Sequence, residues 1–160
     1  MPVKDGLFRA VTTLHRAVFS LSRGRLLARA GGMPVVILTT TGRRTGRTRR
    51  TMLTAPIVDG DRVVLVASYG GDPRHPAWFL NLLDEPQVSL TLGGQDRPMR
   101  ARVAGAEEKV ELWPAIVGAY RGYGAYQRRT DRQIPVVILE PDPGDGSPSA
   151  RKWPGRDGCG

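Results

Sequence analysis

The sequence predicts an α+β fold whose core is an antiparallel β-barrel. The chain has 160 residues, 40% of them apolar, which is enough for one domain with a substantial core but too little for two ordinary domains. About six short β-rich runs are separated by turns that contain glycine, a pattern typical of hairpins. Helical patterns occur at only a few places, whereas a parallel sheet would need a helix after nearly every strand.

The first predicted element is a helix over residues 5–29. Its apolar residues recur at three- and four-residue spacing and share one face: Leu7, Val11, Leu14, Val18 and Leu21. Arginines make the same segment basic, so two interpretations stay open. The helix packs on its own barrel, or it rests on an anionic membrane surface. We expect residues 1–30 to form this amphipathic helix, 31–141 the barrel domain, and 142–160 a disordered tail.

The predicted elements between the helix and the tail follow in order. Strands are expected at 35–41, 52–58 and 62–68, the last two joined by an Asp59-Gly60 hairpin. Pro76 begins a short helix that extends to Leu83, and two strands at 88–92 and 99–103 meet through Gly93-Gly94. A helix beginning at residues 107–108, a helical or turn-like tyrosine segment and a strand at 134–139 complete the barrel domain.

Composition excludes several classes of site. Cys159 is the single cysteine, so no internal disulfide can form, and with only His15 and His75 a zinc cluster is not expected; no metal is predicted. No stretch approaches the roughly 20 apolar residues that cross a bilayer, and the N-terminus makes a poor signal peptide. These features predict a cytoplasmic protein, with peripheral contact at the inner face of the membrane left open. The formal charge of +9 indicates a polyanionic partner.

A basic loop over residues 42–50 is the strongest local candidate for an anion site. Five arginines fall in the eight residues from Arg43 to Arg50, and Gly42 and Gly46 allow the backbone to turn tightly. Planar guanidinium groups bind phosphate and carboxylate through two oxygens at once. The glycine spacing fits neither a P-loop nor the dinucleotide fingerprint. A solvated basic turn and nonspecific nucleic-acid binding remain alternatives.

Four motifs in order resemble one known family. They are LTTTGRRTGRTR at 38–49, VASYGG at 66–71, PRHPAWFLNL at 73–82, and the stretch from Tyr120 through TDR at 130–132 to IPVV at 134–137. Together they resemble the deazaflavin (coenzyme F-420)-dependent nitroreductase family, split β-barrel oxidoreductases of actinobacteria, over about residues 30–141. The resemblance implies a split β-barrel, similar to the FMN-binding barrels, that binds coenzyme F-420, a flavin-like ring carrying a phosphate and a tail of glutamates.

The resemblance also implies roles for individual residues. The groups expected to bind the phosphate and tail are Arg43, Arg44, Arg47 and Arg49. Those expected around the ring are Ala67, Ser68, Tyr69, His75, Pro76, Ala77 and Trp78. The substrate side is expected to contain Thr54, Tyr120, Tyr123 and Tyr126, with Tyr126, Tyr123 and Ser68 as candidate catalytic residues. Tyr69, His75 and Thr54 stand where better-known members carry other residues.

The implied activity is hydride transfer from reduced F-420 to a flat lipophilic acceptor, which the family suggests is a quinone, a nitroaromatic compound or a coumarin-type enone. In such enzymes the cofactor performs the hydride chemistry and the protein supplies position and electrostatics. Three alternatives stay open: a related reductase that uses FMN, a noncatalytic deazaflavin carrier, and a basic nucleic-acid binder. The oligomeric state is not predicted.

Overall fold

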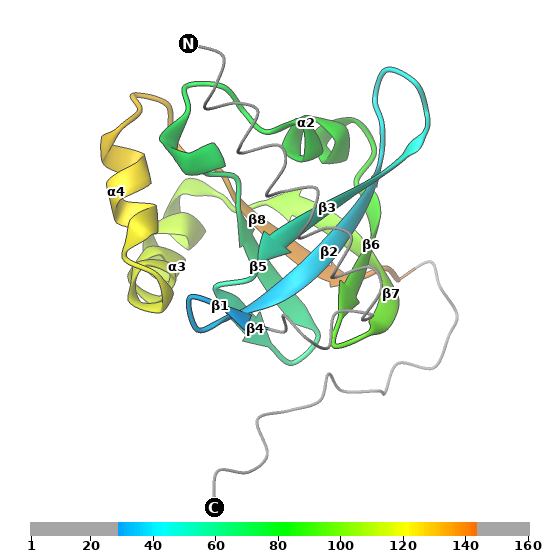
Figure 1. Cartoon of the computed structure of the whole chain (residues 1–160), viewed down its shortest axis with the longest axis horizontal. Helices are drawn as coiled ribbons and strands as arrows, with labels where there is room; N and C mark the ends of the chain where they lie inside the picture. The colour runs from blue at the N-terminus through cyan, green and yellow to red at the C-terminus, as the bar shows by residue number, and fades with distance from the viewer. Residues whose placement is uncertain (1–28, 144–160) are drawn as a thin grey trace, which may run out of the picture.

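The computed structural model describes residues 29–143. The predicted N-terminal helix lies outside this range except for Arg29 and Ala30, which form a short strand instead of a helix, and all but the first two residues of the predicted tail also lie outside it. Within that range the chain folds into antiparallel strands with helices packed beside them (Figure 1). The strands are β1 (Arg29–Ala30), β2 (Met33–Thr41), β3 (Thr48–Thr54), β4 (Ile57–Asp59), β5 (Arg62–Val66), β6 (Gln87–Leu92), β7 (Gln95–Val103) and β8 (Val136–Pro141). The helices are the 3-10 turn η1 (Tyr69–Gly71), α2 (Ala77–Asp84), α3 (Ala106–Ala119) and α4 (Gly122–Arg128). The predicted α+β class is confirmed, and the tyrosine segment forms a helix of its own.

The sheet curls into a barrel that its hydrogen bonds leave open. Its order is β1-β2-β6-β7-β8-β5-β4, with β3 paired to β2, and every pairing in the described range is antiparallel. The strands β3 and β4 therefore lie at opposite ends of this order, yet only Ala55 and Pro56 separate them along the chain. Because two residues span so short a distance, the two ends of the sheet must approach each other.

Several predicted strand boundaries were wrong: the strand expected at 62–68 ends at Val66, that at 99–103 begins at Gln95, and that at 134–139 spans Val136–Pro141. Two further differences affect the site. The expected strand at 52–58 is divided into β3 and β4, because Pro56 has no N–H to donate to a ladder. The basic loop is shorter than expected, since Thr48 already pairs with Thr41 and places Arg49 and Arg50 in β3. The predicted hairpin at Asp59-Gly60 is confirmed by the pairing of Asp59 with Arg62.

Two apolar clusters lie on opposite faces of the sheet. Along β5, Val63 and Leu65 belong to the cluster inside the barrel, whereas Val64 and Val66 belong to the cluster beneath α3 and α4. Alternation of side chains along a strand places successive residues on opposite faces. Both faces of β5 are therefore buried, which explains its uninterrupted apolar sequence. The second cluster also contains Tyr123 of α4, so this helix is held against the barrel by an aromatic residue.

Candidate functional site

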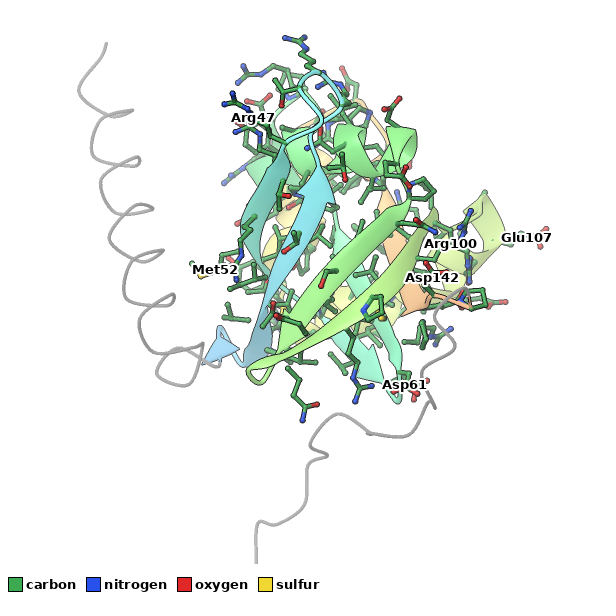
Figure 2. The ribbon with its side chains drawn as sticks, turned by 90° about the vertical axis from the view of Figure 1, so that its right-hand side faces the viewer. Arg47, Met52, Asp61, Arg100, Glu107 and Asp142 are labelled. Atoms are coloured by element: carbon green, nitrogen blue, oxygen red, sulfur yellow. The ribbon has the colours of Figure 1, made fainter. Side chains whose placement is uncertain are left out.

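The basic loop is a tight turn between β2 and β3. The Gly42 amide donates to the Arg47 carbonyl at 2.8 Å, and the Gly46 amide donates to the Gly42 carbonyl at 2.7 Å. Gly46 has a φ of 65°, which favours glycine, and a Cβ atom at Gly42 would lie 3.0 Å from the Arg47 carbonyl oxygen. Figure 2 shows this turn, with Arg47 labelled, at the opposite end of the molecule from Asp61.

The loop presents four exposed arginine side chains without acidic partners. These are Arg43, Arg44, Arg47 and Arg49, and none of them forms an ion pair with another residue between 29 and 143. The structure therefore brings the predicted anion-binding residues together at the end of the β2–β3 ribbon. Exposed guanidinium groups that lack a protein carboxylate are suited to bind an external one or a phosphate.

Asn81 of α2 anchors the loop, a role that sequence reasoning missed. Its Oδ1 accepts from the Arg43 backbone amide at 3.2 Å, and its Nδ2 donates to Thr40 Oγ1 at 3.2 Å. Asn81 and Thr40 are 5% and 2% exposed, so the hydrogen bond between their side chains is shielded from water, whereas the one with the Arg43 amide is only partly shielded. The available signal was a lone amide on the apolar face of a predicted helix, because such a buried polar group must find partners.

The second part of the candidate site is the segment that follows β5. Ala67 and Ser68 are buried, whereas Tyr69 is 54% exposed and has a φ of 46°. Gly71, at the end of η1, packs directly on α4, since a Cβ atom there would lie 2.8 Å from the Tyr126 carbonyl oxygen. The close approach at Gly71 places this segment beside the tyrosines of α4.

Arg132, which is distant in sequence, binds the backbone of the segment that follows β5. Its guanidinium donates to the backbone carbonyl oxygens of Ala67 at 3.1 Å, Ser68 at 2.9 Å and Asp72 at 2.9 Å. Arg132 is the last residue of the TDR motif at 130–132, and these contacts give it a structural role. Its carbonyl partners were not predictable, because they lie 60 to 65 residues away.

His75 lies just before α2 and has partners that the sequence did not reveal. Its Nδ1 is 3.3 Å from Arg132 Nη1, and its ring centroid is 5.0 Å from that of Phe79. Burial lowers the pKa of His75 below its ordinary value, and the positive charge of Arg132 lowers the pKa further. The residues that follow His75 alternate in their exposure to solvent. Pro76 is buried, Ala77 is exposed, and the Trp78 side chain is 6% exposed and lies in the barrel core.

The third part is a cluster of three tyrosines with Thr54. The Tyr120 ring lies 5.5 Å from that of Tyr123 and 6.3 Å from that of Tyr126, and the last two rings are 6.2 Å apart. The Tyr123 hydroxyl is hydrogen-bonded to Thr54 Oγ1 at 3.1 Å. The structure therefore brings together all four residues predicted on the substrate side. Thr54 comes from β3, Tyr123 and Tyr126 come from α4, and Tyr120 lies in the short link between α3 and α4.

The hydroxyls of Tyr123 and Tyr126 stay protonated well above neutral pH, because the pKa of each is raised. Burial raises the pKa of Tyr123, and the hydrogen bond with Thr54 partly opposes the increase. A hydrogen bond with Tyr120 raises the pKa of Tyr126, and burial adds to this increase. A phenol with a raised pKa retains its proton and can donate it to a stronger base.

The arginine loop and the tyrosine cluster occupy opposite ends of one strand. Arg49 and Thr54 are five residues apart in β3, which at a rise of roughly 3.4 Å per residue separates their backbones by about 17 Å. Helix α2 also links the two regions, since His75 and Ala77 lie at its start and Asn81 within it reaches the loop. The two regions thus lie at opposite ends of β3, with cations at one end and aromatic rings at the other. Because side chains alternate along a strand, those of Arg49 and Thr54 project from opposite faces of β3.

The chain is similar to proteins of one family over most of its length. The family model of the F420H(2)-dependent quinone reductases matches residues 8–141. The F420H(2)-dependent quinone reductase Rv1261c of Mycobacterium tuberculosis is 38% identical over 130 residues, which cover 79% of this chain and 87% of the relative.

Solved structures agree with this result. A structure described as an F420-H2 dependent reductase (FDR-A) superposes with a TM-score of 0.61 at 42% identity and covers 67% of this chain and 94% of its own. A second, described as a domain-swapped dimer, has the same TM-score and identity and covers 80% of its own chain. The predicted split-barrel fold is confirmed by this likeness.

The family resemblance, the F-420 cofactor and the reductase class predicted from the sequence are confirmed at the level of the family, whereas FMN finds no support. The arginine loop also fits this cofactor, because exposed guanidinium groups without an ion-pair partner among residues 29–143 suit its phosphate and glutamates. Within residues 29–143 no helix is both long enough and apolar enough to cross a bilayer. The match over residues 8–141, together with the identity to Rv1261c, shows that the chain belongs to the F420H(2)-dependent quinone reductase family.

Proposed function

We propose that this chain transfers hydride from reduced coenzyme F-420 to a quinone, in a site between the arginine loop and the tyrosine cluster. The observation that carries the proposal is the placement of exposed loop arginines at one end of β3 and of a hydroxyl–aromatic cluster around Thr54 at the other, with α2 running from His75 toward the loop that Asn81 anchors. When bound, the reduced cofactor supplies the hydride. The protein residues bind the cofactor and the acceptor, orient them toward each other and supply a proton.

The arginine loop would hold the anionic end of the cofactor. Arg43, Arg44, Arg47 and Arg49 are exposed on a turn whose backbone is fixed by its own hydrogen bonds and by Asn81. A fixed turn reduces the entropy that the guanidinium groups lose when they bind phosphate and carboxylate. These four residues are therefore proposed to determine affinity for the tail.

The segment after β5 and the start of α2 would hold the ring. Ser68, Tyr69, His75, Pro76 and Ala77 are proposed as its surroundings. The side chains of Ala67 and Trp78 are in the barrel core, so their proposed contribution is to fix the backbone on which the others are mounted. Exposed Ala77 offers a small side chain that permits close approach.

Tyr126 is the proposed proton donor. Tyr123 is 5% exposed and its hydroxyl is bonded to Thr54, so we assign it to shaping the pocket. Tyr126 is more exposed, and its raised pKa keeps the phenol protonated at neutral pH. Ser68 is proposed to donate a hydrogen bond to the ring or to the acceptor.

The proposed acceptor class rests on the tyrosine cluster. Three aromatic rings with hydroxyl groups suit a flat, electron-poor and lipophilic molecule. A membrane quinone is proposed as the physiological acceptor, and nitroaromatic compounds and coumarin-type enones as further ones. The basic, amphipathic sequence of residues 5–29 supports peripheral contact with an anionic membrane, where such a quinone resides.

Anaerobic turnover of reduced F-420 with menadione tests the proposal. We expect Arg49→Ala to raise the KM for the cofactor and Tyr126→Phe to lower kcat. Arg100→Ala removes the same charge from an exposed position on β7 and should change neither constant. Tight cofactor binding without turnover on quinones, nitroaromatics or coumarins would instead identify a carrier.

A further inference from the structure

Arg132 and His75 make an exposed contact that bears on which imidazole nitrogen carries a proton. Arg132 Nη1 lies 3.3 Å from His75 Nδ1. A guanidinium has only donors, so a hydrogen bond between these atoms requires Nδ1 to be the acceptor. A neutral imidazole that accepts at Nδ1 carries its proton on Nε2. This nitrogen lies on the other side of the ring from Arg132.

Arg132 itself has little freedom to move away from this contact. The same guanidinium donates to three backbone carbonyl oxygens of the segment after β5, at 2.9 to 3.1 Å. On its other side the imidazole packs on Phe79 of α2, with the ring planes inclined at 44°. His75 is therefore held between a cation that is anchored elsewhere and an aromatic ring.

We propose that Arg132 is a positioning residue that fixes His75 as the Nε2–H tautomer, so that His75 presents a hydrogen-bond donor to an oxygen of the deazaflavin ring. This inference rests on the proposed function, because it takes the ring to bind beside the start of α2. The carbonyl oxygens of a flavin-like ring accept hydrogen bonds, so a fixed N–H group there recognises the ring directly. The tail end of the site plays no part in this recognition.

Protonation of His75 would break the arrangement. An imidazolium has donors at both nitrogens, and its positive charge would face that of Arg132. Asp72 supplies a backbone carbonyl to Arg132, but its carboxylate is paired with Arg74 at 2.9 Å, and Phe79 brings no charge. We therefore expect ring binding to weaken as the pH falls below about 6.5 and through the lowered pKa of His75.

The tautomer can be measured without any cofactor. Nitrogen-15 NMR of the ligand-free full-length chain separates the two imidazole nitrogens, and His15→Gln assigns the signals because the chain has two histidines. We expect an unprotonated Nδ1 and a protonated Nε2 for His75, with titration below the ordinary histidine range. A mixture of tautomers, or a proton on Nδ1, would overturn the proposal.

Variants at both positions test the link to the ring. Arg132→Met should release the tautomer preference. Arg132→Lys keeps the charge and N–H donors but lacks the planar fork, so it should retain part of the preference, and it provides the test if the methionine variant does not fold. His75→Leu should weaken binding of F-420, and of its chromophore lacking phosphate and glutamates, by roughly 3- to 10-fold, the loss of one hydrogen bond.

An asparagine at the same position separates the donor from the titration. The amide of His75→Asn has one acceptor and one donor but no proton to lose near neutral pH, so binding should be retained and become independent of pH between about 5 and 7. If His75→Leu binds the chromophore as tightly as the wild type, the proposal is wrong even though the enzyme turns over. If the tautomer is found but F-420 does not bind, the proposed function fails, and with it the assignment of the donor to the ring.

Discussion

The hydrogen bond between Thr54 and Tyr123 connects the barrel wall to α4. Thr54 is the last residue of β3, and the hydroxyl of the mostly buried Tyr123 reaches it at 3.1 Å. A buried phenol that loses its partner keeps the full cost of its desolvation. This single contact therefore contributes to the position of the helix that carries the proposed proton donor.

Replacing Thr54 by valine should remove this contact while keeping the shape of the side chain. We expect the free energy of unfolding to fall by roughly 1–3 kcal/mol, measured by urea denaturation. The pKa of Tyr123 should rise further, because the hydrogen bond with Thr54 now lowers it. A spectrophotometric titration of the tyrosines checks this direction. Thr54→Ser is the matched control, and equal behaviour of the two variants would count against the contact.

At the scale of single residues, the sequence predicted those clusters whose members are close together in the chain. The arginines of the loop and the three tyrosines are local patterns, so their clustering could be inferred from spacing. The partners of Arg132 and Asn81 lie 38 to 65 residues away, and only the folded barrel brings them into contact. Roles that depend on such distant contacts could not be inferred from one sequence.

At the scale of elements, Gly71 determines how closely η1 packs on α4. Gly71→Ala places a Cβ atom 2.8 Å from the Tyr126 carbonyl oxygen at a φ of 82°. The backbone strain alone should cost about 1–3 kcal/mol, and the clash should add to it. Urea denaturation measures the total, and a shifted α4 should also lower kcat with menadione.

Gly70→Ala provides the matched control for this prediction. Gly70 has a φ of 65°, but a Cβ atom there meets nothing within 4 Å. It should therefore show the cost of the backbone conformation without the clash. If the two variants lose equal stability and equal activity, the close approach of η1 to α4 has no functional consequence.

Helix α2 should couple the fold to the binding of the cofactor tail. Asn81→Leu removes both the acceptor for the Arg43 amide and the donor to Thr40, so the loop loses its anchor. We expect weaker binding of complete F-420, measured by fluorescence titration, and unchanged binding of the chromophore that lacks phosphate and glutamates. Equal weakening of both ligands would show that Asn81 supports the whole site rather than the loop.

The elements themselves were predicted better than their ends. The existence of a strand or helix can be inferred from the spacing of its apolar residues and from the turn residues that flank it, and both are local features of the sequence. The break between β3 and β4 was missed although Pro56 lies within it, because the apolar run continues across the proline. The tyrosine helix α4 was left open between helix and turn, since its glycines weaken the pattern and its packing on Gly71 supplies the missing stabilisation.

At the scale of the whole molecule, the five arginines between Arg43 and Arg50 contribute to the formal charge of +9 at the place where the proposed ligand is most anionic. Affinity for F-420 should therefore fall as the salt concentration rises, because screening weakens attraction between exposed charges beyond about 10 Å at 0.1 M. Titrations at several ionic strengths measure this slope. Arg49→Ala should reduce the slope, whereas Arg100→Ala should leave it unchanged. A slope that does not respond to Arg49 would place the tail elsewhere.

Direct hydride transfer to a quinone is the central claim, and a single-turnover experiment tests it. The full-length chain, saturated with reduced F-420 carrying deuterium or protium at the transferred position, is mixed anaerobically with menadione, and the absorbance of the oxidised cofactor is followed. We predict oxidation of one cofactor per quinone, at a rate that the deuterium slows and that Tyr126→Phe lowers. A cofactor that stays bound and reduced in the presence of menadione would contradict this account.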